Sequence, residues 1–293
     1  MLRTRLIVGT ILVALTAGML FLDESFARWF PFLFATVLLL SILGSLELIR
    51  LLPESRRPNL TVCLGGVFMI VALNWGPTIW LSGITKGISQ EPPSFWWFIG
   101  QGFAVVVLLA FLVEMWNYIE PGGAVERIAL AVWVVAYMGI LPSFLLQLRL
   151  EAHSQMPSVL RQETIALALS IFVPKGCDIG AYFTGRLIGR HRMTPVLSPK
   201  KTWEGAFGGL ALAIAVAFGL NSLGPVIPSG PLGTIAFGLT VGIFGMLGDL
   251  AESLIKRDCE RKDASAAVPG FGGILDVVDS ILFAAPVAYW WLH

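Results

Sequence analysis

Acidic residues that could hold a divalent cation lie near the end of this 293-residue chain. Asp276 and Asp279 follow a Pro-Gly-x-Gly-Gly loop at residues 269–273 and lie three positions apart in an otherwise apolar segment. A helix would place both on one face, where two unpaired aspartates would be costly. A bound cation is the economical explanation, and the glycine-rich loop would let the backbone approach a phosphate closely.

A second acidic cluster occurs in GDLAESLIKR, residues 248–257. Helical spacing puts Asp249, Glu252, Ser253 and Lys256 on one face, directly after a long run without charge. The solvated end of an amphipathic helix would have the same spacing, but it does not explain an aspartate immediately after that run. The pattern favours two carboxylates and a lysine emerging together at headgroup depth.

Two lysines occur in the segment SPKKTWEG, residues 198–205. Ser198 and Pro199 predict the start of a helix, which would place Lys200 and Lys201 beside the positive end of the helix dipole. Cations are unfavourable there for the helix alone, but they suit an anion such as a triphosphate bound at the same place. Ordinary basic residues flanking a membrane span are the alternative.

A fourth polar segment is CDIGAYFTGR, residues 177–186, in which Asp178 falls at or within the edge of an apolar run. A carboxylate in such a position normally has a partner and a purpose. Lys175, three residues earlier on the same helical face, is the expected ion-pair partner. A purely structural ion pair is the alternative to a role in binding a ligand or substrate.

Several other kinds of chemistry are not indicated. The three cysteines and three histidines are scattered, which argues against a zinc site, a disulfide framework or a histidine-based nucleophile. No GxxxxGK[ST], HExxH or GxSxG motif occurs. The net charge of +1 includes no separate basic domain or tail, so no nucleic-acid partner is expected. What remains, carboxylates and cations, suits magnesium and phosphates.

Membrane helices must position these residues. The chain is 56% hydrophobic and 13% charged, with a mean hydropathy of +0.79, values far outside the range of soluble proteins. Because about 20 apolar residues are needed to cross a bilayer as a helix, the sequence predicts an all-α, polytopic bundle of about nine spans. The predicted spans lie near residues 6–22, 30–49, 60–81, 95–116, 128–148, 164–184, 205–222, 232–254 and 273–292.

Charge asymmetry predicts how the chain is oriented. Of the 20 lysines and arginines, fifteen fall on one set of loops, Lys175 falls inside a span, and the opposite set has only Arg28, Lys86, Arg149 and Arg161. Because short basic loops stay cytoplasmic, the N-terminus and the acidic segments are expected in the cytoplasm. Residues 1–160 are expected to form a transmembrane scaffold region and residues 161–293 a transmembrane catalytic region.

The segments SPKKTWEG, GDLAESLIKR and GGILD-x-x-DS, in this order and spacing, resemble those of the phosphatidate cytidylyltransferases, also called CDP-diacylglycerol synthases. The resemblance is specific over residues 177–280, whereas the first 160 residues match in hydropathy only. It implies a homodimer of the inner, cytoplasmic membrane that joins CTP to phosphatidate, releasing pyrophosphate, with the active site facing the cytoplasm. Magnesium is the implied cofactor, and a second cation is left open.

The resemblance also implies roles for individual residues. The metal pair would be Asp249 and Asp276, with Asp279 close by. Two positions depart from the family, because Phe271 and Val277 stand where members commonly have His and Arg. The expected catalytic residues are Asp249, Asp276, Asp279, Lys256 and Lys262, and the expected substrate-binding residues are Asp178, Ser198, Lys200, Lys201, Thr202, Glu204, Glu252, Ser253, Arg257 and Asp263.

The expected mechanism needs no strong general base, because phosphatidate is largely ionised near neutral pH and can attack the α-phosphorus of CTP directly. Catalysis would then consist mostly of positioning and charge neutralisation. Other magnesium-dependent lipid phosphotransferases, such as a CTP-dependent lipid kinase or a polyprenyl-phosphate transferase, are alternatives that lack this motif order. An ion-coupled transporter is a further alternative, but it would need inverted repeats and polar groups at mid-membrane.

Overall fold

The computed structural model describes every residue except 1, 27–28, 80–93, 156–159 and 271. The described chain is almost entirely helical, and it contains eight candidate spans that are long and apolar enough to cross a membrane. The prediction of an all-α polytopic bundle is therefore confirmed, and the chain is an integral membrane protein.

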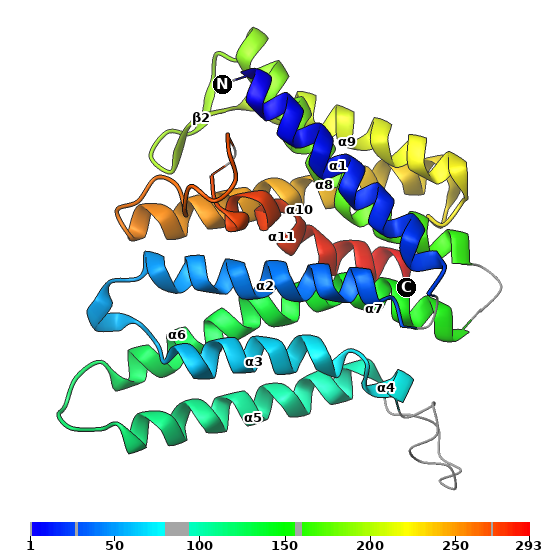
Figure 1. Cartoon of the computed structure of the whole chain (residues 1–293). Coiled ribbons are helices and arrows are strands. Elements are labelled where there is room, and N and C mark those ends of the chain that lie inside the picture. Colours follow the sequence, from blue (N-terminus) through cyan, green and yellow to red (C-terminus); the bar gives the residue numbers. More distant parts are fainter. Residues whose placement is uncertain (1, 27–28, 80–93, 156–159, 271) are drawn as a thin grey trace, which may run out of the picture. The chain divides into compact units, whose positions relative to one another are not determined.

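Residues Gly9–Leu150 form one compact unit. Four of its helices run side by side in Figure 1, namely α2 (Pro31–Leu51), α3 (Leu60–Leu73), α5 (Phe95–Trp116) and α6 (Ala124–Val135). It also contains the 3-10 turn Glu54–Arg56, α4 (Gly76–Ile79) and the π-helical turn Ala136–Ile140. Two further helices belong to it in part: α1 (Leu2–Glu24) begins outside this unit, and α7 (Leu141–Gln155) ends outside it.

Polar side chains inside this unit serve to fix its helices. Asp23 accepts hydrogen bonds from the first backbone N–H groups of α2, at 2.9 Å from Phe32 and 2.7 Å from Leu33. Such a cap satisfies donors that the helix itself leaves without partners. Arg127 of α6 pairs with Glu114 of α5 at 2.8 Å, which joins two neighbouring helices. These contacts give Asp23 and Glu114 structural roles.

The third predicted span differs from the expectation. Helix α3 has only 14 residues and ends at Leu73, where buried Asn74 donates from its side-chain amide to the carbonyl oxygens of Ile70 and Val71, both at 3.1 Å. The short helix α4 follows, and the remainder of the predicted span lies outside the described residues, as do Arg28 and Lys86. The count of nine spans and the cytoplasmic N-terminus stay predictions.

The second compact unit comprises Met1–Val8 and Glu151–His293. Its main helices are α8 (Leu160–Ile188), α9 (Trp203–Leu223), α10 (Gly230–Asp258) and α11 (Ile274–Leu292). This partition does not test the roles of scaffold and catalysis predicted for residues 1–160 and 161–293. Every residue predicted for the site falls in this second unit.

Glycines set how closely these helices approach. A Cβ at Gly180 of α8 would lie 2.8 Å from the backbone oxygen of Gly208, and one at Gly209 of α9 would lie 2.7 Å from that of Cys177. Gly248 of α10 has the same role against α11, since a Cβ there would overlap the backbone oxygen of Asp279. Small residues at helix crossings are a common way for membrane helices to pack backbone against backbone. Helix α10 can thus bring its acidic end directly against α11.

The segment around Ser198 is not the helix start that the sequence predicts. Residues Ser198–Thr202 form strand β2, which pairs antiparallel with β1 (Arg192–Thr194), and α9 begins at Trp203. The prediction was wrong because Thr202 is the N-cap: its hydroxyl accepts a hydrogen bond from the N–H of Gly205 at 3.1 Å. The two lysines therefore lie on a strand before the helix, with Lys200 exposed and Lys201 half-buried.

Candidate active site

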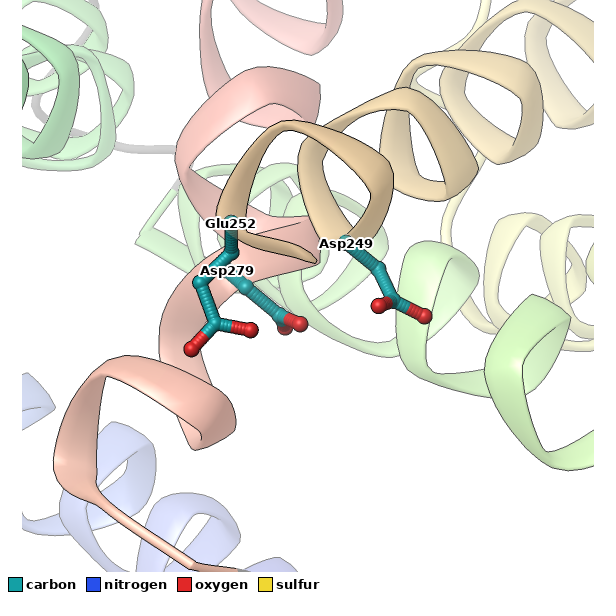
Figure 2. A group of neighbouring side chains, drawn as sticks. All are labelled: Asp249, Glu252 and Asp279. Atoms are coloured by element: carbon teal, nitrogen blue, oxygen red, sulfur yellow. The ribbon is translucent and has the colours of Figure 1, made fainter. Parts of the chain in front are cut away.

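Three carboxylates from two helices converge in the second unit. Asp249 and Glu252 lie one turn apart on α10, and Asp279 comes from the neighbouring helix α11 (Figure 2). One oxygen from each carboxylate lies within 4.8 Å of the others. A hard divalent cation prefers oxygen ligands of this kind, so this group is a candidate metal centre.

Glu252 has a buried carboxylate oxygen that receives no hydrogen bond from the described residues. Its side chain is buried, with 1% of its surface exposed, and one oxygen receives a hydrogen bond from Lys256 at 2.6 Å. The other oxygen, Oε1, has no hydrogen-bond partner among the described residues. A buried carboxylate oxygen without a donor is costly, and a cation at the group would remove that cost.

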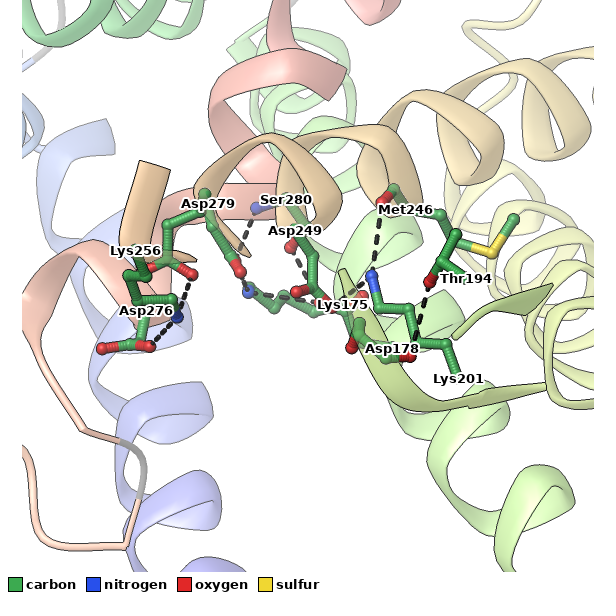
Figure 3. A network of polar contacts seen from close by, with 12 residues as sticks. Lys175, Asp178, Thr194, Lys201, Met246, Asp249, Lys256, Asp276, Asp279 and Ser280 are labelled. Carbon is green, nitrogen blue, oxygen red and sulfur yellow. Dashed lines mark hydrogen bonds and ion pairs between the residues drawn. The ribbon is translucent and has the colours of Figure 1, made fainter. Parts of the chain in front are cut away.

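Two lysines link these acids to two further carboxylates, and a third lysine pairs with Asp249 alone (Figure 3). We call the whole set, together with Ser280, the carboxylate–lysine network. Lys201 of β2 pairs with Asp249 at 2.9 Å. Lys256 pairs with both Glu252 and Asp276 at 2.6 Å, and Lys175 pairs with both Asp178 and Asp279 at 3.3 Å.

Asp276 occupies a different position from the other predicted metal ligands. Its Oδ2 accepts hydrogen bonds from the backbone N–H of Gly273 at 2.7 Å and of Ala264 at 3.3 Å, while Oδ1 receives Lys256. It therefore caps α11 and holds the preceding loop, which turns back at Gly272 with a φ of 112°. The metal role predicted for Asp276 stays a prediction, and the geometry places Glu252 nearer to Asp249 and Asp279.

Asp178 is tied to α11 as well as to its own helix. The expected ion pair with Lys175 is present, and the hydroxyl of Ser280 donates to the same carboxylate at 2.8 Å. The backbone N–H of Ser280 donates to Asp279 at 2.6 Å. Ser280 and Lys175 thus hold Asp178 and Asp279 from two sides, a link across 104 residues that helical spacing could not reveal.

The loop before α9 is organised by Glu204. Its carboxylate pairs with the ring of His191 at 2.5 Å and accepts a hydrogen bond from the backbone N–H of Arg190 at 3.1 Å. His191 is one of the three scattered histidines for which the sequence indicates no role; in the structure it faces Glu204 across the hairpin. This contact closes the base of the hairpin that presents Lys201 to Asp249.

The structure places the remaining predicted residues around the network's edge. The guanidinium of Arg257 donates to the backbone oxygen of Leu197 at 3.4 Å, which joins the end of α10 to the hairpin. Lys262 and Asp263 are exposed, and Val277 is half-buried on the first turn of α11. Phe271 lies outside the described residues. Ser198 and Ser253 are half-buried.

A family model described as the cytidylyltransferase family matches residues 3–293. The chain belongs to that family. This cytidylyltransferase-family protein is 30% identical over 261 residues to phosphatidate cytidylyltransferase 5, chloroplastic, of Arabidopsis thaliana, covering 78% of the chain and 64% of the relative.

Bacterial relatives match a shorter part of the chain. Phosphatidate cytidylyltransferase of Haemophilus influenzae is 38% identical over 147 residues, covering 48% of this chain and 49% of the relative. That of Bacillus subtilis is 41% identical over 115 residues, covering 39% and 42%. The matches thus span between 42% and 64% of the length of these three relatives.

Proposed function

We propose that this protein transfers the cytidylyl group of CTP to phosphatidate. A phosphate oxygen of phosphatidate forms a bond to the α-phosphorus of CTP, the bond from that phosphorus to the bridging oxygen breaks, and pyrophosphate leaves. The observation that carries the proposal is the carboxylate–lysine network, in an integral membrane protein of the cytidylyltransferase family. The network brings together carboxylates, which can hold a metal ion, and lysine ammonium groups, which can bind phosphate, near the ends of apolar helices.

Magnesium is the proposed cofactor, and the donor set fits it. Asp249, Glu252 and Asp279 offer oxygens from three separate carboxylates, and Glu252 retains a buried oxygen with no described partner. These three residues would hold the ion. When bound, such an ion neutralises negative charge on the reacting phosphates and on the leaving pyrophosphate.

The chain's own residues account for positioning. Lys201 reaches Asp249 from a strand outside the helices, and its 21% exposed side chain lies at the accessible edge of the network, where a nucleotide phosphate can meet it. Lys256 is more deeply buried and holds Glu252 and Asp276 in fixed orientations. Because the attacking phosphate is already ionised near neutral pH, no side chain has to remove a proton from it.

The proposed setting is the inner, cytoplasmic membrane, with the network facing the cytoplasm and a homodimer as the working unit. The fifteen basic residues assigned to one set of loops support this orientation. CTP would come from the cytoplasm and the lipid phosphate from the interface, so the two would meet at the network.

The proposal is tested with purified protein, CTP and lipid vesicles. Release of pyrophosphate and formation of CDP-diacylglycerol should require CTP, phosphatidate and Mg²⁺ together. Release that occurs with a different lipid acceptor but not with phosphatidate would indicate another lipid phosphotransferase. Absence of any CTP-dependent product, in protein that is folded and carries divalent metal, would refute the proposal.

A further inference from the structure

The charges of the network nearly balance, but not completely. Five carboxylates are paired with three ammonium groups, so two negative charges remain if all are ionised. One divalent cation would neutralise these two remaining negative charges. The acids are Asp178, Asp249, Glu252, Asp276 and Asp279, and the ammonium groups belong to Lys175, Lys201 and Lys256.

Lys175 joins two carboxylates that come from different helices. Its ammonium lies between Asp178 of α8 and Asp279 of α11, at 3.3 Å from each, with 28% of the side chain exposed. Ser280 donates to the same two carboxylates, through its hydroxyl at 2.8 Å and its backbone N–H at 2.6 Å. Two acids held this closely from separate helices repel each other when both are ionised, and a positive charge between them offsets that repulsion.

The unsatisfied part of the network lies elsewhere. The carboxylate oxygen without a described partner belongs to Glu252, which is in the group with Asp249 and Asp279 and is held by Lys256 rather than by Lys175. Asp279 belongs to both parts, since it pairs with Lys175 and is also a member of the carboxylate group. The carboxylate oxygen without a described partner therefore lies in a group that shares Asp279 with the ion pair of Lys175.

We propose that the ammonium of Lys175 takes the place of a second metal ion, so that the site holds a single divalent cation at Asp249, Glu252 and Asp279. This inference rests on the proposed function, because it concerns the number of ions bound at the same cation site. Lys175 is a positioning residue: it fixes Asp178 and Asp279 and limits the number of ions. Removing its charge would leave three negative charges and open a second cation position between these two acids.

The number of bound ions can be counted directly with Mn²⁺, which replaces Mg²⁺ and is visible by electron paramagnetic resonance. Full-length protein in nanodiscs would be titrated in choline chloride buffer, so that no small monovalent cation competes. The wild type and Lys175→Arg should bind one Mn²⁺ per chain. Lys175→Met should bind two, and the double variant Lys175→Met with Asp178→Asn, which restores the charge balance, should return to one.

The number of ions bound by each variant supports or overturns the inference about Lys175. Two ions in the wild type, or one in folded Lys175→Met, would overturn the inference; Lys175→Gln is the second neutral variant if Lys175→Met does not fold. No bound ion in the wild type would overturn both the metal assignment and the inference. A third result would refute the proposed function alone. In it, the wild type binds one ion and Lys175→Met binds two, but the wild type forms no product from CTP and phosphatidate.

Discussion

The substitution Glu252→Gln separates the ligand set that the structure favours from the one that the sequence implied. Glutamine keeps the shape of the side chain and removes one negative charge from a group that is 1% exposed. Two unit charges about 4 Å apart interact by about 4 kcal/mol at the effective dielectric of a partly buried site, and the second charge of the divalent ion adds to this attraction. Its loss should weaken Mn²⁺ binding by at least roughly a thousandfold, and turnover at a metal concentration that saturates the wild type should fall steeply.

Asp276→Asn is the matched comparison, because it also exchanges a carboxylate for an amide in the same network. The asparagine oxygen can still accept from the N–H of Gly273, so the cap of α11 is kept while the charge opposite Lys256 is lost. A charge-assisted hydrogen bond contributes about 1.5 to 3 kcal/mol, so the melting temperature should fall. Turnover should also fall through Lys256, but Mn²⁺ affinity should change less than about tenfold, or about 1.4 kcal/mol.

The assay is Mn²⁺ titration followed by product formation at a metal concentration that saturates the wild type, with melting temperature and gel filtration as checks on folding. If Asp276→Asn weakens Mn²⁺ binding as strongly as Glu252→Gln does, Asp276 is a ligand and the geometric assignment is wrong. If Glu252→Gln binds Mn²⁺ as tightly as the wild type, the buried oxygen of Glu252 has no part in holding the ion.

Three further outcomes are expected. Gly248→Ala should cost about 1 to 3 kcal/mol of stability and reduce activity, because the added Cβ would force α10 away from α11. Thermal unfolding measures the stability and product formation measures the activity; a variant unchanged in both would refute the close approach of the two helices. Cysteines introduced into loops 185–203 and 257–269 should resist an impermeant reagent outside intact cells, and labelling there would overturn the orientation. The unmodified chain should form CDP-diacylglycerol without Phe271→His and Val277→Arg; activity gained only in that double variant would identify a degenerate site.

The sequence by itself determined the class of the protein and the type of its chemistry. Long apolar runs permit only helices in a membrane, because each backbone N–H and C=O must be satisfied within its own segment. Spacing within one helix also placed Asp249 and Glu252 on a common face and paired Lys175 with Asp178, since positions three apart are neighbours on a helix. These are local relations, and local periodicity is sufficient to predict them.

The tertiary structure alone decided which acids meet. The spacing of Asp276 and Asp279 suggested a pair, yet backbone N–H groups and Lys256 engage the first, while the second turns toward Asp249 and Lys175. This division depends on how closely α10 and α11 approach, which Gly248 permits, and on a hairpin where a helix start was expected. Contacts between segments far apart in the chain depend on packing, and no periodicity within a single segment encodes them.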